Sequence, residues 1–409
     1  MPLNARLRAG RAPLALGLAG LATVLVAVLL FVLRSSGPEE PERRALPPVG
    51  AWSNLPDLAT VRGTASAVVL GDGDVLVAGG GVSAIALAAA EVFNPGTGQS
   101  TTVASLNQAR RGHRAVVLKD GRVLATGGIA EGALLASAEV YDPVRRAWSP
   151  TAPMSTPRLG HSLSLLGDGR VIAIGGTVPA GDAAAAAEAI RPDASAEIYD
   201  PAKGTWAPAA SMGSPRFEHT STPLADGRVL IAGGLGPGGD GLRPLQSVEV
   251  YDPAANAFVR STDLNEGRTN HAAAVLADGS VLVVGGAGGT SGDVSLSSAE
   301  VFDPRQGSWT AVSRLAESRT GQTATALADG GVLVAGGESV SRGTRRSLSS
   351  AEVFDPSART WRSAGSMSCP RSEHEAVRLV DGSVLVIAGD AAFPGKAPIA
   401  QSCVGRFQP

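Results

Sequence analysis

Residues 113–148 read HRAVVLKDGRVLATGGIAEGALLASAEVYDPVRRAW, and this stretch decides the fold. It contains four short segments rich in apolar and β-branched residues, around residues 113–118, VLATGG, EVYDP and Trp148. An Asp-Gly pair separates the first two segments and favours a type I′ hairpin, in which both turn residues have positive φ. Short apolar segments divided by such turn signals predict four antiparallel strands in a meander.

The same unit recurs along the chain at a period of roughly 50 residues. Each copy has an Asp-Gly turn seven residues before a double glycine that ends an apolar strand. The double glycines are Gly79-Gly80, Gly127-Gly128, Gly175-Gly176, Gly233-Gly234, Gly285-Gly286, Gly336-Gly337 and a degenerate Ala388-Gly389. A Tyr-Asp-Pro-like motif follows each, and an aromatic residue stands seven positions later in every intact copy except at Ser100.

The ends of the repeat region complete one another. Six copies are complete, and a seventh stops at Phe407-Gln408-Pro409, which aligns with the Tyr-Asp-Pro of a third strand. Its missing fourth strand is found near the start, because Ala51-Trp52-Ser53 matches Ala147-Trp148-Ser149. We therefore predict an all-β, seven-bladed propeller over residues 51–409, with four antiparallel strands per blade and the ring closed by the N-terminal strand.

In its double-glycine, Tyr-Asp-Pro and Trp motifs this region resembles the kelch-repeat β-propellers, in the superfamily that includes the central domain of galactose oxidase. The resemblance covers residues 51–409 and points to a bacterial type with an N-terminal membrane anchor. Copper-radical oxidases of that superfamily need a Tyr–Cys pair and His ligands outside the repeat positions. Here every His, Trp and Tyr occupies a repeat position. We therefore expect scaffold roles for these residues, and no copper, other metal, cofactor or catalytic residue of that kind.

Composition excludes other classes of protein. The chain has 35 Lys and Arg against 37 Asp and Glu, which argues against nucleic-acid binding because that function normally shows a basic excess. Two cysteines are too few for a disulfide-dense mini-fold or a four-Cys zinc site.

The N-terminal region predicts an anchor rather than part of the propeller. Residues 1–11 are basic, residues 12–33 form an unbroken apolar run long enough to cross a bilayer, and residues 34–50 form a Pro-rich linker. The positive-inside rule then places residues 1–11 in the cytoplasm and the propeller on the extracytoplasmic side, periplasmic or at the cell surface. The alternative is a processed signal peptide, which would make the protein secreted.

Variation between copies is confined to one face of the predicted propeller. The segment between the second glycine and the Glu of the next motif holds 10, 10, 20, 14, 13 and 14 residues in blades 1 to 6, whereas the Asp-Gly turns are uniform. The longest segment, residues 177–196, includes an Ala-rich piece at residues 183–187. Variable loops on a rigid scaffold are typical of a binding surface.

An arginine recurs near this variable face in every copy. Each stands three residues before the position that carries His in five copies, and we select these arginines as candidate ligand-binding residues, since Arg suits carboxylates. They are Arg62, Arg110, Arg158, Arg216, Arg268, Arg319 and Arg371. The alternative is pairing within the blades, because six third strands begin with Glu on the same face. Gly405 replaces that Glu in the seventh copy, which would leave Arg371 without its partner.

Cys369 and Cys403 both lie on this face in the seventh copy. An oxidising compartment permits a disulfide between them. Two strand spacings exceed the roughly 7 Å Cα limit for a disulfide unless the loops converge, so the sequence leaves this bond open.

Three functional interpretations remain. The first is a non-enzymatic binding module that engages a protein segment or a cell-envelope glycan through the variable face. The second is an extracytoplasmic carbohydrate-active enzyme, an isomerase or hydrolase, that uses Arg and Glu in the central funnel, with Glu218 or Glu373 as acid–base groups. The third is a structural spacer without a ligand. The enzyme requires carboxylates with perturbed pKa values in a defined pocket.

Overall fold

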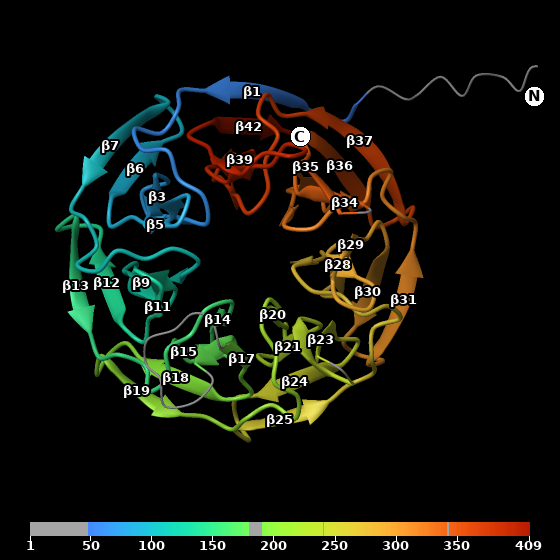
Figure 1. The fold of residues 1–409 in the computed structure, drawn as a ribbon, viewed down its shortest axis with the longest axis horizontal. Helices are drawn as coiled ribbons and strands as arrows, with labels where there is room; N and C mark the ends of the chain where they lie inside the picture. The colour runs from blue at the N-terminus through green and yellow to red at the C-terminus, as the bar shows by residue number, and fades with distance from the viewer. Residues whose placement is uncertain (1–47, 180–189, 240, 342) are drawn as a thin grey trace, which may run out of the picture. The chain divides into compact units, whose positions relative to one another are not determined.

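The structure, a computed structural model, describes residues 48–179, 190–239, 241–341 and 343–409. In this part of the chain seven four-stranded antiparallel sheets stand around a central axis as the blades of a propeller (Figure 1). The predicted propeller is therefore confirmed. The predicted anchor at residues 12–33 lies outside the described residues, and no helix within them is long and apolar enough to cross a membrane.

The strands of each blade run from the axis to the rim in the order inner, second, third and outer. The inner strands of blades 1 to 7 are β2 (Ser66–Val69), β8 (Arg114–Val117), β14 (Ser162–Leu165), β20 (Thr220–Pro223), β26 (Ala272–Val275), β32 (Thr323–Ala326) and β38 (Glu375–Arg378). The second strands are β3 (Val75–Ala78), β9 (Val123–Thr126), β15 (Val171–Ile174), β21 (Val229–Ala232), β27 (Val281–Val284), β33 (Val332–Ala335) and β39 (Val384–Ile387). The third strands are β6 (Ala90–Asn94), β12 (Ala138–Asp142), β18 (Ala196–Asp200), β24 (Val248–Asp252), β30 (Ala299–Asp303), β36 (Ser350–Asp355) and β42 (Val404–Gln408). The outer strands are β7 (Gln99–Val103), β13 (Ala147–Thr151), β19 (Thr205–Pro208), β25 (Ala257–Arg260), β31 (Ser308–Val312), β37 (Thr360–Ser366) and, in blade 7, β1 (Ala51–Leu55).

The second strands form the core of each blade contact. The four residues of β27 are all fully buried, because each second strand is packed on both faces by neighbouring blades. The buried apolar residues accordingly form seven clusters, one between each pair of adjacent blades. Burial on both faces explains why these strands read as continuous apolar runs rather than as alternating ones.

The Asp-Gly turns differ from the predicted type I′ turn. In blade 1 the N–H of Gly73 donates to the carbonyl of Leu70 at 3.0 Å, and the N–H of Leu70 donates to the carbonyl of Asp74 at 2.8 Å. Only Gly73, at φ +89°, has a positive φ; Asp72 does not. The connection is therefore a three-residue loop with a glycine bulge, in which Asp72 Oδ1 accepts the N–H of Asp74 at 3.1 Å.

The ring closes as the sequence predicts. Strand β1 pairs with β42, and Trp52 lies opposite Phe407 with ring centroids 5.2 Å apart. Equivalent tilted aromatic pairs occur between third and outer strands in blades 2 to 6. The indole Nε1 of Trp52 also donates to the carbonyl of Ala364 in blade 6, at 2.7 Å, which ties the N-terminal strand to two blades.

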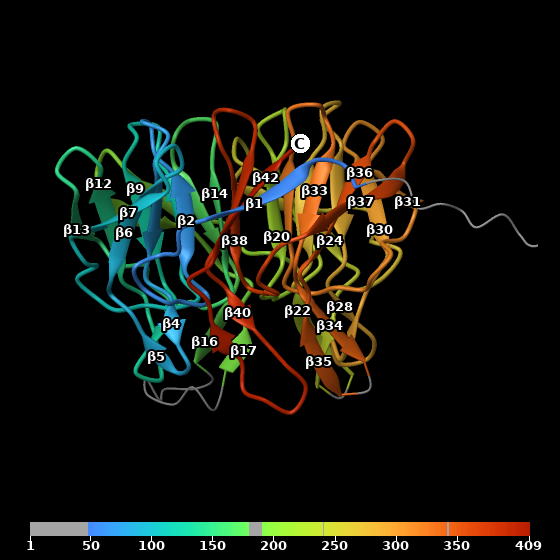
Figure 2. The same cartoon turned by 90° about the horizontal axis from the view of Figure 1, so that it is seen from above.

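The variable segments form an additional layer on one side of the propeller, which we call the hairpin face (Figure 2). Where the sequence analysis expects loops, each segment contributes a short two-stranded hairpin. The pairs are β4 (Gly81–Val82) with β5 (Ile85–Ala86), β10 (Ile129–Ala130) with β11 (Ala133–Leu134), β16 (Thr177–Pro179) with β17 (Ile190–Pro192), β22 (Leu235–Gly238) with β23 (Gly241–Pro244), β28 (Ala287–Gly288) with β29 (Val294–Ser295), β34 (Glu338–Ser341) with β35 (Thr344–Ser347), and β40 (Asp390–Ala391) with β41 (Ile399–Ala400). The Ala-rich piece at residues 183–187 lies outside the described residues. We call the opposite side, with the Asp-Gly turns, the turn face.

Candidate functional site

The seven recurring arginines are internal to the blades. Each has at most 1% of its surface exposed. In blades 1 to 6 the guanidinium pairs with the Glu of the third strand, with N–O distances between 2.8 and 3.0 Å. A guanidinium buried in this way cannot contact a ligand on the surface. This corrects the ligand-binding interpretation of the arginines, and the alternative of pairing within the blades describes the structure.

These ion pairs fix the segments that lead from one blade to the next. Glu249 Oε1 accepts a hydrogen bond from Arg216 at 3.0 Å, and the same carboxylate accepts the N–H groups of Gly213 and Ser214 at 2.7 and 3.2 Å. Arg216 also donates to the carbonyl of Gly233 at 2.8 Å. Burial lowers the pKa of Arg216, and the charge of Glu249 opposes that shift. The recurring Arg and Glu are thus scaffold residues.

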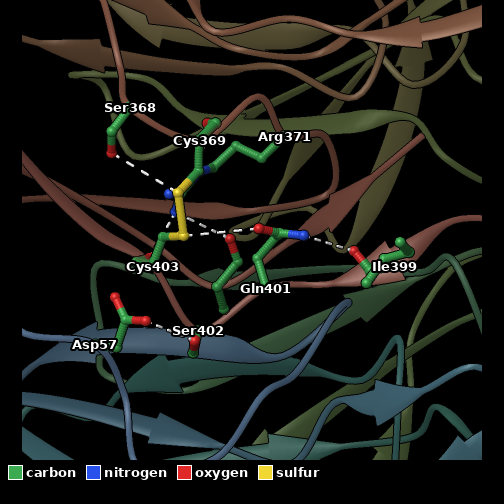
Figure 3. The surroundings of a disulfide bond; sticks show 9 residues. Asp57, Ser368, Cys369, Arg371, Ile399, Gln401, Ser402 and Cys403 are labelled. Atoms are coloured by element: carbon green, nitrogen blue, oxygen red, sulfur yellow. Dashed lines mark hydrogen bonds between the residues drawn. A yellow bond between two sulfur atoms is a disulfide. The ribbon is translucent and has the colours of Figure 1, made fainter. Parts of the chain in front are cut away.

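Blade 7 replaces this ion pair with a covalent bond (Figure 3). Gly405 occupies the Glu position, and Arg371 donates to the carbonyls of Ala388 and Cys403 at 3.1 and 2.7 Å without a carboxylate partner among the described residues. Burial lowers the pKa of Arg371 to about 10. Cys369 and Cys403 form a disulfide with Cα atoms 6.6 Å apart, because the two loops converge.

The histidines join neighbouring blades. The Nε2 of each lies 2.8 to 3.0 Å from a Ser or Thr hydroxyl of the preceding blade. All five are buried, and burial together with nearby arginines lowers their pKa values, to about 3 for His113, His271 and His374. They are therefore neutral at physiological pH, which fits the scaffold role expected from their repeat position.

The central channel opens on the hairpin face as a cavity of about 480 Å³ to which all seven blades contribute. Its rim consists of the residues that directly precede the histidine positions: Thr64, Gly112, Gly160, Glu218, Asn270, Gly321 and Glu373. All seven have a positive φ, between +48° and +66°. Five of the seven steps around this rim carry a hydrogen bond from an N–H to the preceding rim carbonyl, at 2.8 to 3.1 Å. The rim is thus a rigid belt on which glycine is the unstrained choice.

Carboxylates gather in this cavity. Asn270 Nδ2 donates to Glu373 Oε1 at 2.6 Å across the rim. This contact passes over Gly321, where a Cβ would lie 2.6 Å from the Glu373 oxygen, so any side chain there would displace it. Glu218 and Glu375 also line the cavity, together with Arg111 and Arg114 from blade 2. Arg114 Nε donates to the carbonyl of His161 at 3.1 Å.

Three carboxyl groups in and beside the channel, those of Glu218, Glu375 and Asp390, have raised pKa values. Burial raises the pKa of Glu375 to about 7, with Glu373 adding to the shift and Arg114 opposing it. Burial and then Glu373 raise the pKa of Glu218 in the same way, and that of Asp390 at the channel edge to about 6. Burial is thus the main cause of all three pKa shifts, and the negative charge of Glu373 adds to each of them.

The hairpin face also exposes apolar side chains. Six of the eleven exposed large apolar residues in the described part of the chain lie on the hairpins: Val82, Ile85, Leu242, Val294, Phe393 and Ile399. Four of these belong to the neighbouring blades 7 and 1, and Val61 beside them is also exposed. The face therefore combines an apolar area with an acidic channel.

Sequence reasoning found part of this site. It named Glu218 and Glu373, and the structure brings both to the channel rim. It missed Glu375, Asp390 and Arg114. A signal was present, because Glu375 and Arg114 follow the histidine position, where four of the other copies have Ser or Thr. The charged residues of the channel are thus found at positions where one copy departs from the repeat, not at the positions that all copies share.

Comparison with known proteins agrees with this architecture. The model of the kelch motif matches residues 110–155, 160–213, 268–316 and 319–368, which correspond to blades 2, 3, 5 and 6. The fold and these repeats define a β-propeller built from kelch motifs. The protein is a kelch-repeat β-propeller.

Curated relatives match it over part of their length. The chain is 32% identical to Kelch-like protein 35 of Mus musculus over 45% of this chain and 29% of that protein. It is 28% identical to Kelch-like protein 34 of Homo sapiens over 47% and 30% of the two chains. An F-box/kelch-repeat protein of Arabidopsis thaliana is 38% identical over 28% of this chain and 30% of that protein. The chain thus spans less than a third of these relatives.

A solved structure shares the fold. It is described as a novel fungal alcohol oxidase of the AA5 family in complex with copper, and it matches with a TM-score of 0.68 and 19% identity over 88% of this chain and 76% of that one. This likeness shows the fold alone. The described residues contain no group of three or more His, Cys, Asp or Glu that could hold a metal, and the histidines are committed to blade contacts. The residues therefore do not fit a copper site.

Proposed function

We propose that this propeller is a non-enzymatic binding module that holds a segment of a partner protein on its hairpin face, over the central channel. The observation that carries the proposal is the contrast between the faces. The turn face repeats one loop seven times, whereas the hairpin face varies in length, charge and apolar exposure around a cavity. Variable surface on a rigid scaffold is where binding residues are expected.

The apolar residues of blades 7 and 1 support a protein rather than a glycan as the ligand. Phe393 and Ile399 have 41% and 54% of their surface exposed, and Ile85 has 71%. Contiguous exposed apolar area rimmed by polar groups marks protein interaction sites. A cell-envelope glycan is the second ligand class for this face.

The proposal includes an extracytoplasmic location with the apolar run of residues 12–33 as the anchor. The flanking arginines and the disulfide between Cys369 and Cys403 support it, since disulfides persist in oxidising compartments. The propeller begins at Ala51, which pairs with Gln408 at the end of β42 on the turn face.

The test is capture of partners from cell-envelope extract by the full-length chain in detergent. The variant Phe393→Ser with Ile399→Ser removes apolar surface from the hairpin face. The matched control, Val144→Ser with Val380→Ser, removes side chains that are 92% and 90% exposed in turns of the turn face. We expect a protein captured by the native chain and the control but lost with the hairpin variant. Equal capture by all three would contradict the proposal, and capture of envelope glycan instead of protein would favour the glycan.

The channel carboxylates favour a second candidate, a carbohydrate-active enzyme. Burial raises the pKa of Glu375 to about 7, and a carboxyl group that stays partly protonated near neutral pH is suited to general acid catalysis. Hydrolysis or isomerisation of envelope oligosaccharides by the native chain, abolished by Glu375→Gln, would establish this candidate. No turnover of any oligosaccharide by the native chain would reject it.

A further inference from the structure

We infer that the central channel recognises a cationic group, the ammonium or guanidinium of a basic peptide side chain, and that Glu218, Glu373 and Glu375 hold it. This inference rests on the proposed binding function and specifies the ligand chemistry. The three carboxylates come from two blades that are distant in sequence, yet they line one cavity of about 480 Å³. That volume accommodates a Lys or Arg side chain with part of its backbone.

The position of these carboxylates is not a consequence of the repeat. Glu218 and Glu373 occupy rim positions with φ of +53° and +50°, where three other blades have glycine. A residue other than Gly, Asn or Asp is uncommon in that conformation. Glu375 occupies a position that carries a short side chain in most other blades. The repeat therefore does not require a carboxylate at any of these three positions.

One buried acceptor of the channel, the amide oxygen of Gln322, lacks a donor. Gln322 is 6% exposed and lines the cavity between the blades of Asn270 and Glu373, and its Oε1 has no hydrogen-bond partner in the described part of the chain. A buried acceptor without a donor is unfavourable. A ligand that brings several N–H donors and a positive charge would satisfy this acceptor together with the three carboxylates.

The positive charges that would repel a cationic ligand both lie on one blade of the channel. Arg111 and Arg114 both belong to blade 2, whereas the carboxylates and Asp390 belong to blades 4 and 7. No ion pair joins either arginine to a carboxylate within the described residues. A basic peptide could therefore place its cation at the carboxylates and a backbone carbonyl toward blade 2.

The inference is tested with four acetylated and amidated tripeptides, Gly-Lys-Gly, Gly-Arg-Gly, Gly-Gln-Gly and Gly-Glu-Gly, titrated into the full-length chain by calorimetry. We expect the Lys or Arg peptide to bind at least about tenfold more tightly than the Gln peptide, a difference of about 1.4 kcal/mol, because hydrogen bonds to charged groups are the stronger ones. Glu373→Gln with Glu375→Gln should remove that preference. Glu131→Gln, an exposed acid on the hairpin of blade 2, is the matched control and should retain it.

Proton release provides an independent measurement. A bound cation stabilises ionised Glu375, so binding at pH 7 should release a proton, which appears as a dependence of the measured heat on the ionisation enthalpy of the buffer. Tighter binding of the Glu peptide, no binding of the cationic peptides, or proton uptake would overturn the inference. The loss of a protein partner with the Phe393→Ser, Ile399→Ser variant would in that case leave the proposed function intact, so the two failures are distinguishable.

Discussion

At the scale of single residues, blades 1 to 6 each contain a buried Arg–Glu pair. Removing one member of a buried pair leaves an uncompensated charge, which costs far more than loss of an exposed pair. Arg216 is fully buried and Glu249 is 5% exposed, whereas Arg260 and Asp263 form a pair with 71% and 41% of their side chains exposed. The two pairs lie on the same blade and offer a direct comparison.

We expect Glu249→Gln to lower the free energy of unfolding by about 3 kcal/mol, because Arg216 loses its counter-charge. Asp263→Asn should lower it by less than about 1 kcal/mol. Urea unfolding followed by circular dichroism measures both. Similar losses for the two variants would show that the recurring ion pairs are not the source of blade stability.

The buried histidines predict a loss of stability in acid. Their pKa in the folded protein is lowered by burial, to about 3 for His271, so the unfolded chain binds more protons below its own pKa near 6.5. Their contribution is therefore complete above pH 6.5 and declines as pH falls, by up to about 1.4 kcal/mol per pH unit for each histidine. Glu375, with a raised pKa of about 7, acts oppositely and destabilises the fold as pH rises through that value.

The variant that checks this is His271→Gln, which copies Gln322 of blade 6. Between pH 7.5 and 5 we expect the variant to lose less unfolding free energy than the native chain. The comparison uses the change with pH within each protein, so a uniform loss of stability does not affect it. An equal decline in both proteins would exclude His271 as a source of acid sensitivity.

At the scale of elements, the turns show why a correct strand prediction accompanied a wrong turn type. The Asp-Gly signal locates the hairpin correctly, but a bulge shifts the positive φ to the glycine alone.

Gly227, at φ +85°, has open space around its Cβ position, and so has Gly167, whose φ is not positive. Gly227→Ala should therefore lower the free energy of unfolding by about 1 kcal/mol through backbone strain alone. Gly167→Ala should leave the free energy of unfolding unchanged or raise it. Chemical denaturation measures both variants, and equal losses for the two substitutions would contradict the explanation by backbone strain.

The limits of sequence reasoning also appear at this scale. The strands, blades and ring closure could be predicted because every blade repeats the Asp-Gly turn and the glycine that ends the second strand, and blades 2 to 7 repeat the aromatic pair. The hairpins could not, because two-residue strands such as β4 and β10 carry no periodicity. The sequence analysis interpreted the seven arginines as ligand-binding residues of the variable face because they recur beside it. In the structure each arginine is buried inside its own blade, so the repetition reflects a role in the scaffold. Glu375 was not predicted as a site residue because its neighbours in the cavity, Glu218 and Arg114, are distant in sequence and meet it only in the folded ring.

At the scale of the whole molecule, blade 7 must close the ring with the two ends of the chain. It is also the blade without the Arg–Glu pair, and the disulfide occupies the place of a hydrogen bond seen elsewhere. In blade 5 Ser298 donates to Glu266 at 2.5 Å, and in blade 2 Ser137 donates to Gln108 at 2.5 Å. Cys403 and Cys369 stand at the equivalent positions. The covalent bond thus holds the same two segments that the recurring Glu holds in other blades.

This equivalence predicts that an Arg–Glu pair in blade 7 can replace the stabilising effect of the disulfide. Cys369→Ser with Cys403→Ser should lower the free energy of unfolding by about 2–4 kcal/mol, the usual range for a closed loop of this kind.

A Cβ at Gly405 would lie 3.5 Å from Trp52, an ordinary contact, so Gly405→Glu fits at that position. Added to the cysteine-free variant, Gly405→Glu should supply a carboxylate for Arg371 and recover much of the lost stability, whereas Gly405→Gln should recover less because it brings no charge. Thermal melts of the native chain and of the three cysteine-free variants in one buffer measure the exchange. If Gly405→Glu gives no recovery, Arg371 is satisfied by its carbonyl contacts alone, and the disulfide acts on the ring closure between β42 and β1 rather than in place of the ion pair.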